Sequence, residues 1–105
     1  MTTSSLRRSA DFRRVLTKGQ RIRRGGLTLV CSPGPDDEIR IGLVVGRSVG
    51  NAVKRNRAKR RLRQALRQTE WEQGMDYVII ADRQVGEAPY AALSDWLDRA
   101  VRESR

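Results

Sequence analysis

Histidine is absent from this sequence, cysteine occurs once, and only five of the 105 residues are aromatic. Without histidine, neither a Ser-His-Asp triad nor a Cys-His dyad can form, and the usual zinc-site spacings cannot occur. The lone Cys31 excludes an intramolecular disulfide, as is typical of cytosolic proteins, and is interpreted as a small core residue. No run approaches the roughly 18 apolar residues that span a bilayer, and residues 1–8 lack the apolar region of a signal peptide. We expect a cytoplasmic protein with no membrane partner, no catalytic residues and no metal site.

Acidic residues are missing from one continuous stretch. Residues 39–69 contain ten Arg and Lys and no Asp or Glu, so this stretch accounts for the whole formal net charge of +10. Eight of the ten cations lie between Lys54 and Arg67. A solvated helix face normally interleaves charges of both signs, so this density predicts a polyanionic partner. The excess of Arg over Lys favours nucleic acid, because a guanidinium can grip a phosphate with two hydrogen bonds.

Other classes of protein with a basic helix or acidic cluster fit less well. A basic-zipper DNA-binding helix needs apolar heptads after its basic region, but residues 70–74 end this one. Membrane-surface and calmodulin-target helices place bulky apolar residues opposite the charge, where this segment offers chiefly Ala, Val and Leu. An RNA-recognition motif carries aromatic residues on adjacent strands, and the strand-like segments 27–32 and 39–46 contain none. The acidic cluster 36–38 is interpreted as a solvated turn rather than a cation site.

Hydrophobic periodicity predicts three helices and three strands. The first helix spans 10–18, with Ser9 as its N-cap and Gly19 as its end, and the basic helix spans 51–69 with Asn51 as its N-cap. The last helix follows Pro89. The strands are 27–32, 39–46 and 76–83, and the first two are expected to pair as a hairpin through the turn 33–38. This order predicts an α+β fold with helices packed on a small sheet, in a single domain over residues 1–105 with residues 1–7 flexible.

The segment from Arg47 to Arg63 carries a recognisable motif. It reads Arg-Ser-Val-Gly-Asn-Ala-Val-Lys-Arg-Asn-Arg-Ala-Lys-Arg-Arg-Leu-Arg. This resembles the signature of the bacterial ribonuclease P protein subunit, Gly-x-Ala-Val-x-Arg-Asn-Arg-x-Lys-Arg-x-x-Arg, and every fixed position is met. Residues 8–19, with the Asp11-Phe12 pair, and residues 76–81 are similar to the opening helix and last strand of that family.

The resemblance implies an RNA-binding subunit of an endoribonuclease. In this family the partner is a large catalytic RNA, which with its Mg²⁺ ions removes the 5′ leader of precursor tRNA, and one protein serves each RNA. The chain itself is expected to hold no cofactor and to bind no DNA. The alternative is a general structured-RNA-binding or ribosome-associated protein with no role in tRNA processing.

Two sets of contact residues follow from the resemblance. The set expected to bind the catalytic RNA is Arg47, Lys54, Arg55, Asn56, Arg57, Lys59, Arg60, Arg61, Arg63 and Arg67. The set expected to line a cleft for the single-stranded leader is Phe12, Leu16, Arg21, Val30, Asn56 and Arg63. Many relatives have aromatic residues at the positions of Leu16 and Val30, so base stacking should be weaker in this chain. Ala52 and Val53 are interpreted as packing residues.

The resemblance also implies a specific topology. The order is helix, strand, strand, short strand, helix, strand, helix, similar to the second domain of ribosomal protein S5. Its β-α-β crossover through the basic helix is left-handed, whereas generic reasoning favours the right-handed connection found in about 98% of parallel crossovers.

Overall fold

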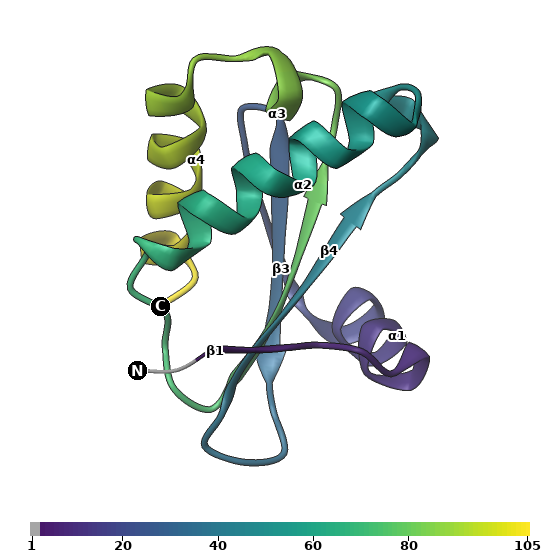
Figure 1. Ribbon diagram of the computed structural model, residues 1–105. Coiled ribbons are helices and arrows are strands. Elements are labelled where there is room, and N and C mark those ends of the chain that lie inside the picture. The colour runs from purple at the N-terminus through teal and green to yellow at the C-terminus, as the bar shows by residue number, and fades with distance from the viewer. Residues whose placement is uncertain (1–2) are drawn as a thin grey trace.

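A computed structural model describes residues 3–105 of the chain (Figure 1). Its elements in chain order are β1 (Thr3–Ser5), α1 (Ser9–Lys18), β2 (Gln20–Arg24), β3 (Leu27–Pro33), β4 (Ile39–Val45), a 3₁₀ turn (Arg47–Val49), α2 (Ala52–Arg67), β5 (Met75–Ala81), α3 (Gln84–Glu87) and α4 (Tyr90–Glu103). The α+β class is confirmed.

The five strands form one mixed sheet in the order β1-β4-β5-β3-β2. β5 pairs with β4 in parallel and with β3 in antiparallel fashion. The predicted hairpin between residues 27–32 and 39–46 is therefore wrong, because β5 lies between these strands. Tyr77, Val78 and Ile79 point to alternate faces and are all fully buried, and only a central strand buries both of its faces in this way.

The hairpin of this fold joins β2 to β3, with Ile22 opposite Leu29. Its turn contains Gly25, which has a φ of +54°, a conformation that favours glycine. A Cβ atom at Gly25 would also overlap the indole ring of Trp96. β2 was not among the strands expected from the sequence, and the 3₁₀ turn follows β4 where the resemblance implies a short strand.

The sheet separates two hydrophobic cores. Odd-numbered residues of β3 and β5, such as Leu29 and Ile79, face α2 and α4 and pack with Leu62 and Leu97. Even-numbered residues face α1, where Val30, Val78, Val15 and Leu6 form the smaller core. Alternation along the strands thus gives each face its own helical cover.

The chain start differs from the sequence expectation. Residues 1–7 were expected to be flexible; residues 1 and 2 lie outside the described part, but Thr3–Ser5 pairs in parallel with Ile39–Ile41. The backbone N–H of Leu6 donates to the carbonyl of Ile41 (3.0 Å), and the Leu6 side chain is buried. Ser9 is not the N-cap of α1 either, because it lies inside the helix and Arg8 takes that place.

The β4-α2-β5 connection is left-handed. Its two strands are parallel neighbours. In Figure 1 both run upward, α2 crosses in front of the sheet, and β5 lies to the left of β4. A chain that rises, passes in front and returns on the left makes a left-handed turn, so the unusual crossover is confirmed against the general rule.

Candidate nucleic-acid interface

Helix α2 carries many cationic side chains and packs on the sheet through small and aliphatic residues. Its 16 residues contain no acid, glycine or proline, and most are strong helix formers. The Asn51 side chain accepts a hydrogen bond from the backbone N–H of Lys54 (3.0 Å), which confirms the predicted N-cap. Ala58, Leu62 and Ala65 are buried and attach the helix to the core. The remaining faces are left to the charged side chains.

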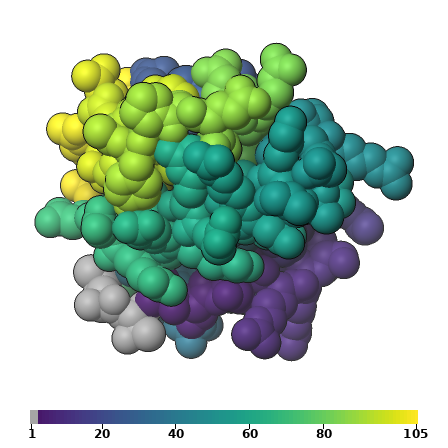
Figure 2. Space-filling model, turned by 45° about the horizontal axis from the view of Figure 1, so that its top comes forward, coloured from purple at the N-terminus to yellow at the C-terminus, as the bar shows by residue number. Residues whose placement is uncertain are grey.

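Five of the eight cations of α2 lie on two flanks of the helix. Lys59, Arg63 and Arg67 line a groove along the edge of β4, whereas Lys54 and Arg57 line a pocket beside α3. Figure 2 shows α2 in teal between the green and yellow C-terminal segments and the purple N-terminal segments. The helix can therefore meet polyanions on either side.

Two predicted contact residues are engaged within the protein. Arg61 donates from Nη1 to the carbonyl of Val85 (2.8 Å) and from Nη2 to that of Ala88. Burial, together with the nearby charge of Arg57, lowers the pKa of Arg61. Arg55 donates from Nη1 to the carbonyl of Gly50 (3.1 Å). These bonds hold α3 and the start of α2 in place.

The groove along β4 has a volume of about 400 Å³. Thr3–Ser5 of β1 and Leu6 line it together with Ile41, Gly42 and Leu43, so the groove runs between β1, β4 and α2. Phe12 reaches it from α1 and Leu43 from β4. It combines an aromatic ring, aliphatic side chains and three cations, which suits an unpaired nucleotide chain: bases can contact the apolar floor while Arg and Lys bind phosphates.

Phe12 both packs and faces the groove. Its ring lies over Gly42, where a Cβ atom would overlap the ring. It is half-buried and packs against the smaller core with Leu16, Val44 and Ile80. Val44 and Ile80 lie in predicted strands, and alternation along residues 39–45 and 75–81 places them on this face.

The predicted leader residues are not all accessible. Val30 is fully buried beside Val15 and Val78, which contradicts its predicted role as a contact, because α1 covers that part of β3. Leu16 is half-buried. Arg21 is exposed on β2 and donates from Nη2 to the carbonyl of Leu16 (2.9 Å).

The outer face of α2 carries Asn56 and Arg60, both exposed. Arg47 is exposed on the 3₁₀ turn before the helix. Val53 was interpreted as a packing residue, but it is 76% exposed, and Ala52 is exposed as well. Their place on the first turn of α2, away from the sheet, explains the difference.

A buried ion-pair network fixes α1 on the sheet. Asp76 is fully buried and accepts hydrogen bonds from Nε (2.9 Å) and Nη2 (2.7 Å) of Arg40 and from Arg14 of α1. Asp11, next to Phe12, lies 3.5 Å from Arg40. Burial alone would raise the pKa of Asp76, but the hydrogen bonds from Arg40 and Arg14 outweigh it and hold this pKa below its ordinary value.

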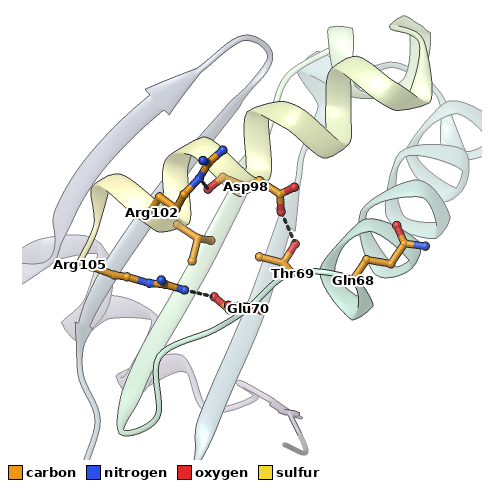
Figure 3. Close-up of a pocket in the computed structure, with 7 residues that line it drawn as sticks. Gln68, Thr69, Glu70, Asp98, Arg102 and Arg105 are labelled. Atoms are coloured by element: carbon orange, nitrogen blue, oxygen red, sulfur yellow. Dashed lines mark hydrogen bonds between the residues drawn. The ribbon is translucent and has the colours of Figure 1, made fainter.

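A second pocket lies between the end of α2 and α4 and has a volume of about 280 Å³ (Figure 3). Its polar groups bind one another: Thr69 Oγ1 donates to Asp98 Oδ1 (3.3 Å), and Arg105 Nη2 donates to the carbonyl of Glu70 (2.8 Å). It mixes acids with bases and does not extend the cationic surface.

Residues 3–105, which the structure describes, contain no group of three His, Cys, Asp or Glu placed to hold a metal ion. In the turn 33–38, Asp36 Oδ1 accepts the backbone N–H of Glu38 (2.9 Å), which is a turn-forming contact. None of the helices described is long and apolar enough to cross a membrane.

Known proteins similar to this chain agree on one family. The family model described as Ribonuclease P matches residues 1–105. A ribonuclease P protein component of Chloroflexus aggregans is 40% identical over 102 residues, which cover 94% of this chain and 76% of that protein. One of Paramagnetospirillum magneticum is 41% identical over 105 residues, covering 92% and 79%.

Solved structures agree with the fold. The RNase P protein of Thermotoga maritima superposes with a TM-score of 0.85 at 22% identity, covering 97% of this chain and 98% of that one. The RNase P protein of Staphylococcus aureus gives a TM-score of 0.83 at 21% identity, covering 99% and 97%. With the match of its whole length to the family model, the chain belongs to the ribonuclease P protein component family.

Proposed function

We infer that this chain acts as the protein subunit of ribonuclease P, the endoribonuclease that matures the 5′ end of tRNA, and that it works by binding RNA. The observation that carries this function is α2: a 16-residue helix with no acid, inside the family signature, with cations on both flanks. Family membership makes ribonuclease P RNA its partner.

We assign different RNA strands to the two flanks of α2. The exposed face with Arg57 and Arg60 would bind phosphates of the catalytic RNA. The groove with Phe12, Lys59 and Arg63 would hold the single-stranded leader of precursor tRNA. Arg63 belongs to both predicted sets, and its position in the groove supports the leader contact. Two RNA strands repel each other, and a protein of net charge +10 between them lowers that repulsion.

We assign the cleavage step itself to the catalytic RNA. The surface that this chain would offer is cationic, which suits phosphates and not Mg²⁺, so the Mg²⁺ ions of the reaction belong to the RNA in this proposal. The residues of the chain would position and screen the RNA strands. We further propose that one protein binds each catalytic RNA in the cytoplasm.

The test is binding specificity. Affinity for bacterial ribonuclease P RNA should exceed affinity for an unrelated folded RNA of equal length by at least about tenfold at physiological salt, because matched shape adds contacts to the nonspecific phosphate term. Equal affinity for both RNAs would instead favour the general structured-RNA-binding protein.

A further inference from the structure

The flank of α2 that faces away from Phe12 carries a pocket that the family signature does not describe. Its volume is about 90 Å³, and it lies between α2, the 3₁₀ turn and α3. Lys54 and Arg57 line it from α2, and Arg83, the residue just before α3, lines it as well. Val49 and Gly86 supply its apolar part.

The three cations of this pocket are not neutralised within the protein. In the part of the chain that the structure describes, none of them lies within ion-pair distance of a carboxylate. Glu87 is the one acid that lines the pocket. Three positive charges against one negative charge leave a net attraction for an anion.

Arg83 is held beside α2 by contacts that do not use its own side chain. The two hydrogen bonds from Arg61 to the carbonyls of Val85 and Ala88 tie α3 to α2. Val85 is fully buried and anchors α3 in the larger core. Asp82 Oδ1 accepts the backbone N–H of Gln84 (2.8 Å), which sets the chain direction at Arg83. The pocket is thus built by the fold.

We propose that Arg83 joins Lys54 and Arg57 in a phosphate-binding pocket that contacts the backbone of the catalytic RNA. The inference rests on the proposed function and adds a residue outside the signature. A pocket of 90 Å³ is far below the roughly 300–1,000 Å³ of small-molecule sites, so it suits one phosphate with part of its ribose and not a whole nucleotide.

Position decides which RNA the pocket binds. The leader groove lies on the opposite flank of α2, with Phe12 and Arg63, so a leader strand seated there does not reach Arg83. The pocket adjoins Arg57 and the start of the helix, on the surface assigned to the catalytic RNA. Arg83 is therefore a contact for the ribozyme and not for the substrate.

The test compares Arg83→Gln with Arg99→Gln in the full chain. Both remove one positive charge, but Arg99 lies on α4 and pairs with Asp95 (3.0 Å) away from the pocket. Arg83→Gln should weaken binding to bacterial ribonuclease P RNA by about threefold to tenfold and lower the salt slope by about one. Arg99→Gln should change neither quantity by comparable amounts. Equal effects of the two variants would overturn the proposal.

A gain of affinity provides a second test. Glu87→Gln removes the acid from the pocket, so it should tighten binding to the same RNA, and it should do so less when Arg83 is already Gln. A Glu87→Gln protein that binds no tighter would contradict the pocket. An Arg83→Gln effect seen only on leader-bearing precursor tRNA would contradict the assignment to the catalytic RNA.

Failure of this inference is distinguishable from failure of the proposed function. If Arg57→Gln weakens RNA binding while Arg83→Gln and Glu87→Gln do not, the pocket is overturned and the subunit assignment stands. If the unmodified chain does not prefer ribonuclease P RNA over an unrelated folded RNA, both the pocket and the subunit assignment are overturned.

Discussion

The ring of Phe12 on α1 lies against the backbone of Gly42 in β4, in space that any larger residue at position 42 would occupy. This contact joins the smaller core to the groove, because Phe12 also lines the groove with Lys59 and Arg63. A glycine in a strand interior often marks such a close approach. The position of the Phe12 ring thus depends on the absence of a side chain at position 42.

Gly42→Ala should displace the Phe12 ring. We expect a loss of about 1–3 kcal/mol in the free energy of unfolding, as for other overpacked cores, and weaker binding of leader-bearing precursor tRNA. The matched control is Gly46→Ala just after β4, because a Cβ atom there has no neighbour within 4 Å. Urea unfolding and substrate affinity measure both effects. Equal stability of the two variants would show that the ring does not depend on Gly42.

Leu16→Phe should strengthen leader binding. Leu16 is half-buried, one helical turn after Phe12, so an aromatic ring there adds a stacking surface for a base, worth about 1–3 kcal/mol. The holoenzyme with this variant should bind leader-bearing precursor tRNA several-fold more tightly and leaderless tRNA equally well. An equal change for both substrates would contradict a leader contact at this position.

Asp76→Asn should destabilise the protein at neutral pH. It leaves Arg40 and Arg14 without their buried carboxylate, a loss of about 3–5 kcal/mol for a broken buried pair. Because the folded pKa of Asp76 is below its ordinary value of 3.8, its stabilisation is complete only well above that value and is lost as the pH falls through the folded pKa. Wild-type stability should therefore fall more steeply below pH 4 than that of the variant.

The control for this network is Asp95→Asn, which breaks an exposed helical pair with Arg99. Such a pair contributes about 0.3–0.5 kcal/mol, so thermal unfolding at neutral pH should barely change. If Asp76→Asn were as mild as this control, the network would not be what holds α1 on the sheet.

Arg60 and Arg61 should behave oppositely although they are adjacent. Arg61→Gln removes hydrogen bonds from a charged group to the carbonyls of Val85 and Ala88, so we expect a stability loss of about 1.5–3 kcal/mol. Arg60→Gln alters an exposed side chain and should change stability by less than about 0.5 kcal/mol, yet weaken RNA binding. Unfolding and RNA titration of both variants decide this, and a stability loss for Arg60→Gln would contradict the division of roles.

Local patterns in the sequence predicted the helices better than the sheet. Asn51 as N-cap, Pro89 before the last helix and the cationic surface of α2 follow from local chemistry, and the structure confirms them. The position of β5 between β3 and β4 does not follow, because strand pairing depends on contacts distant in sequence. Its residues are apolar on both faces, which indicates a buried strand without naming its neighbours.

The candidate site shows the same limit at the level of single residues. The charge pattern located α2, but it could not distinguish Arg61, which bonds to α3, from Arg60, which faces solvent. The burial of Val30 depends on where α1 lies across the sheet. Arg83 lies outside the signature and enters the pocket only through the packing of α3.

The most direct measurement is the cleavage rate of leader-bearing precursor tRNA by bacterial ribonuclease P RNA at low Mg²⁺, with and without this chain. The protein should accelerate cleavage strongly, and the effect should need both RNA and protein. A variant with Lys54, Arg57 and Arg60 changed to Gln should accelerate it much less. No acceleration by a preparation shown to bind that RNA would contradict the assignment of this chain as the protein subunit of ribonuclease P.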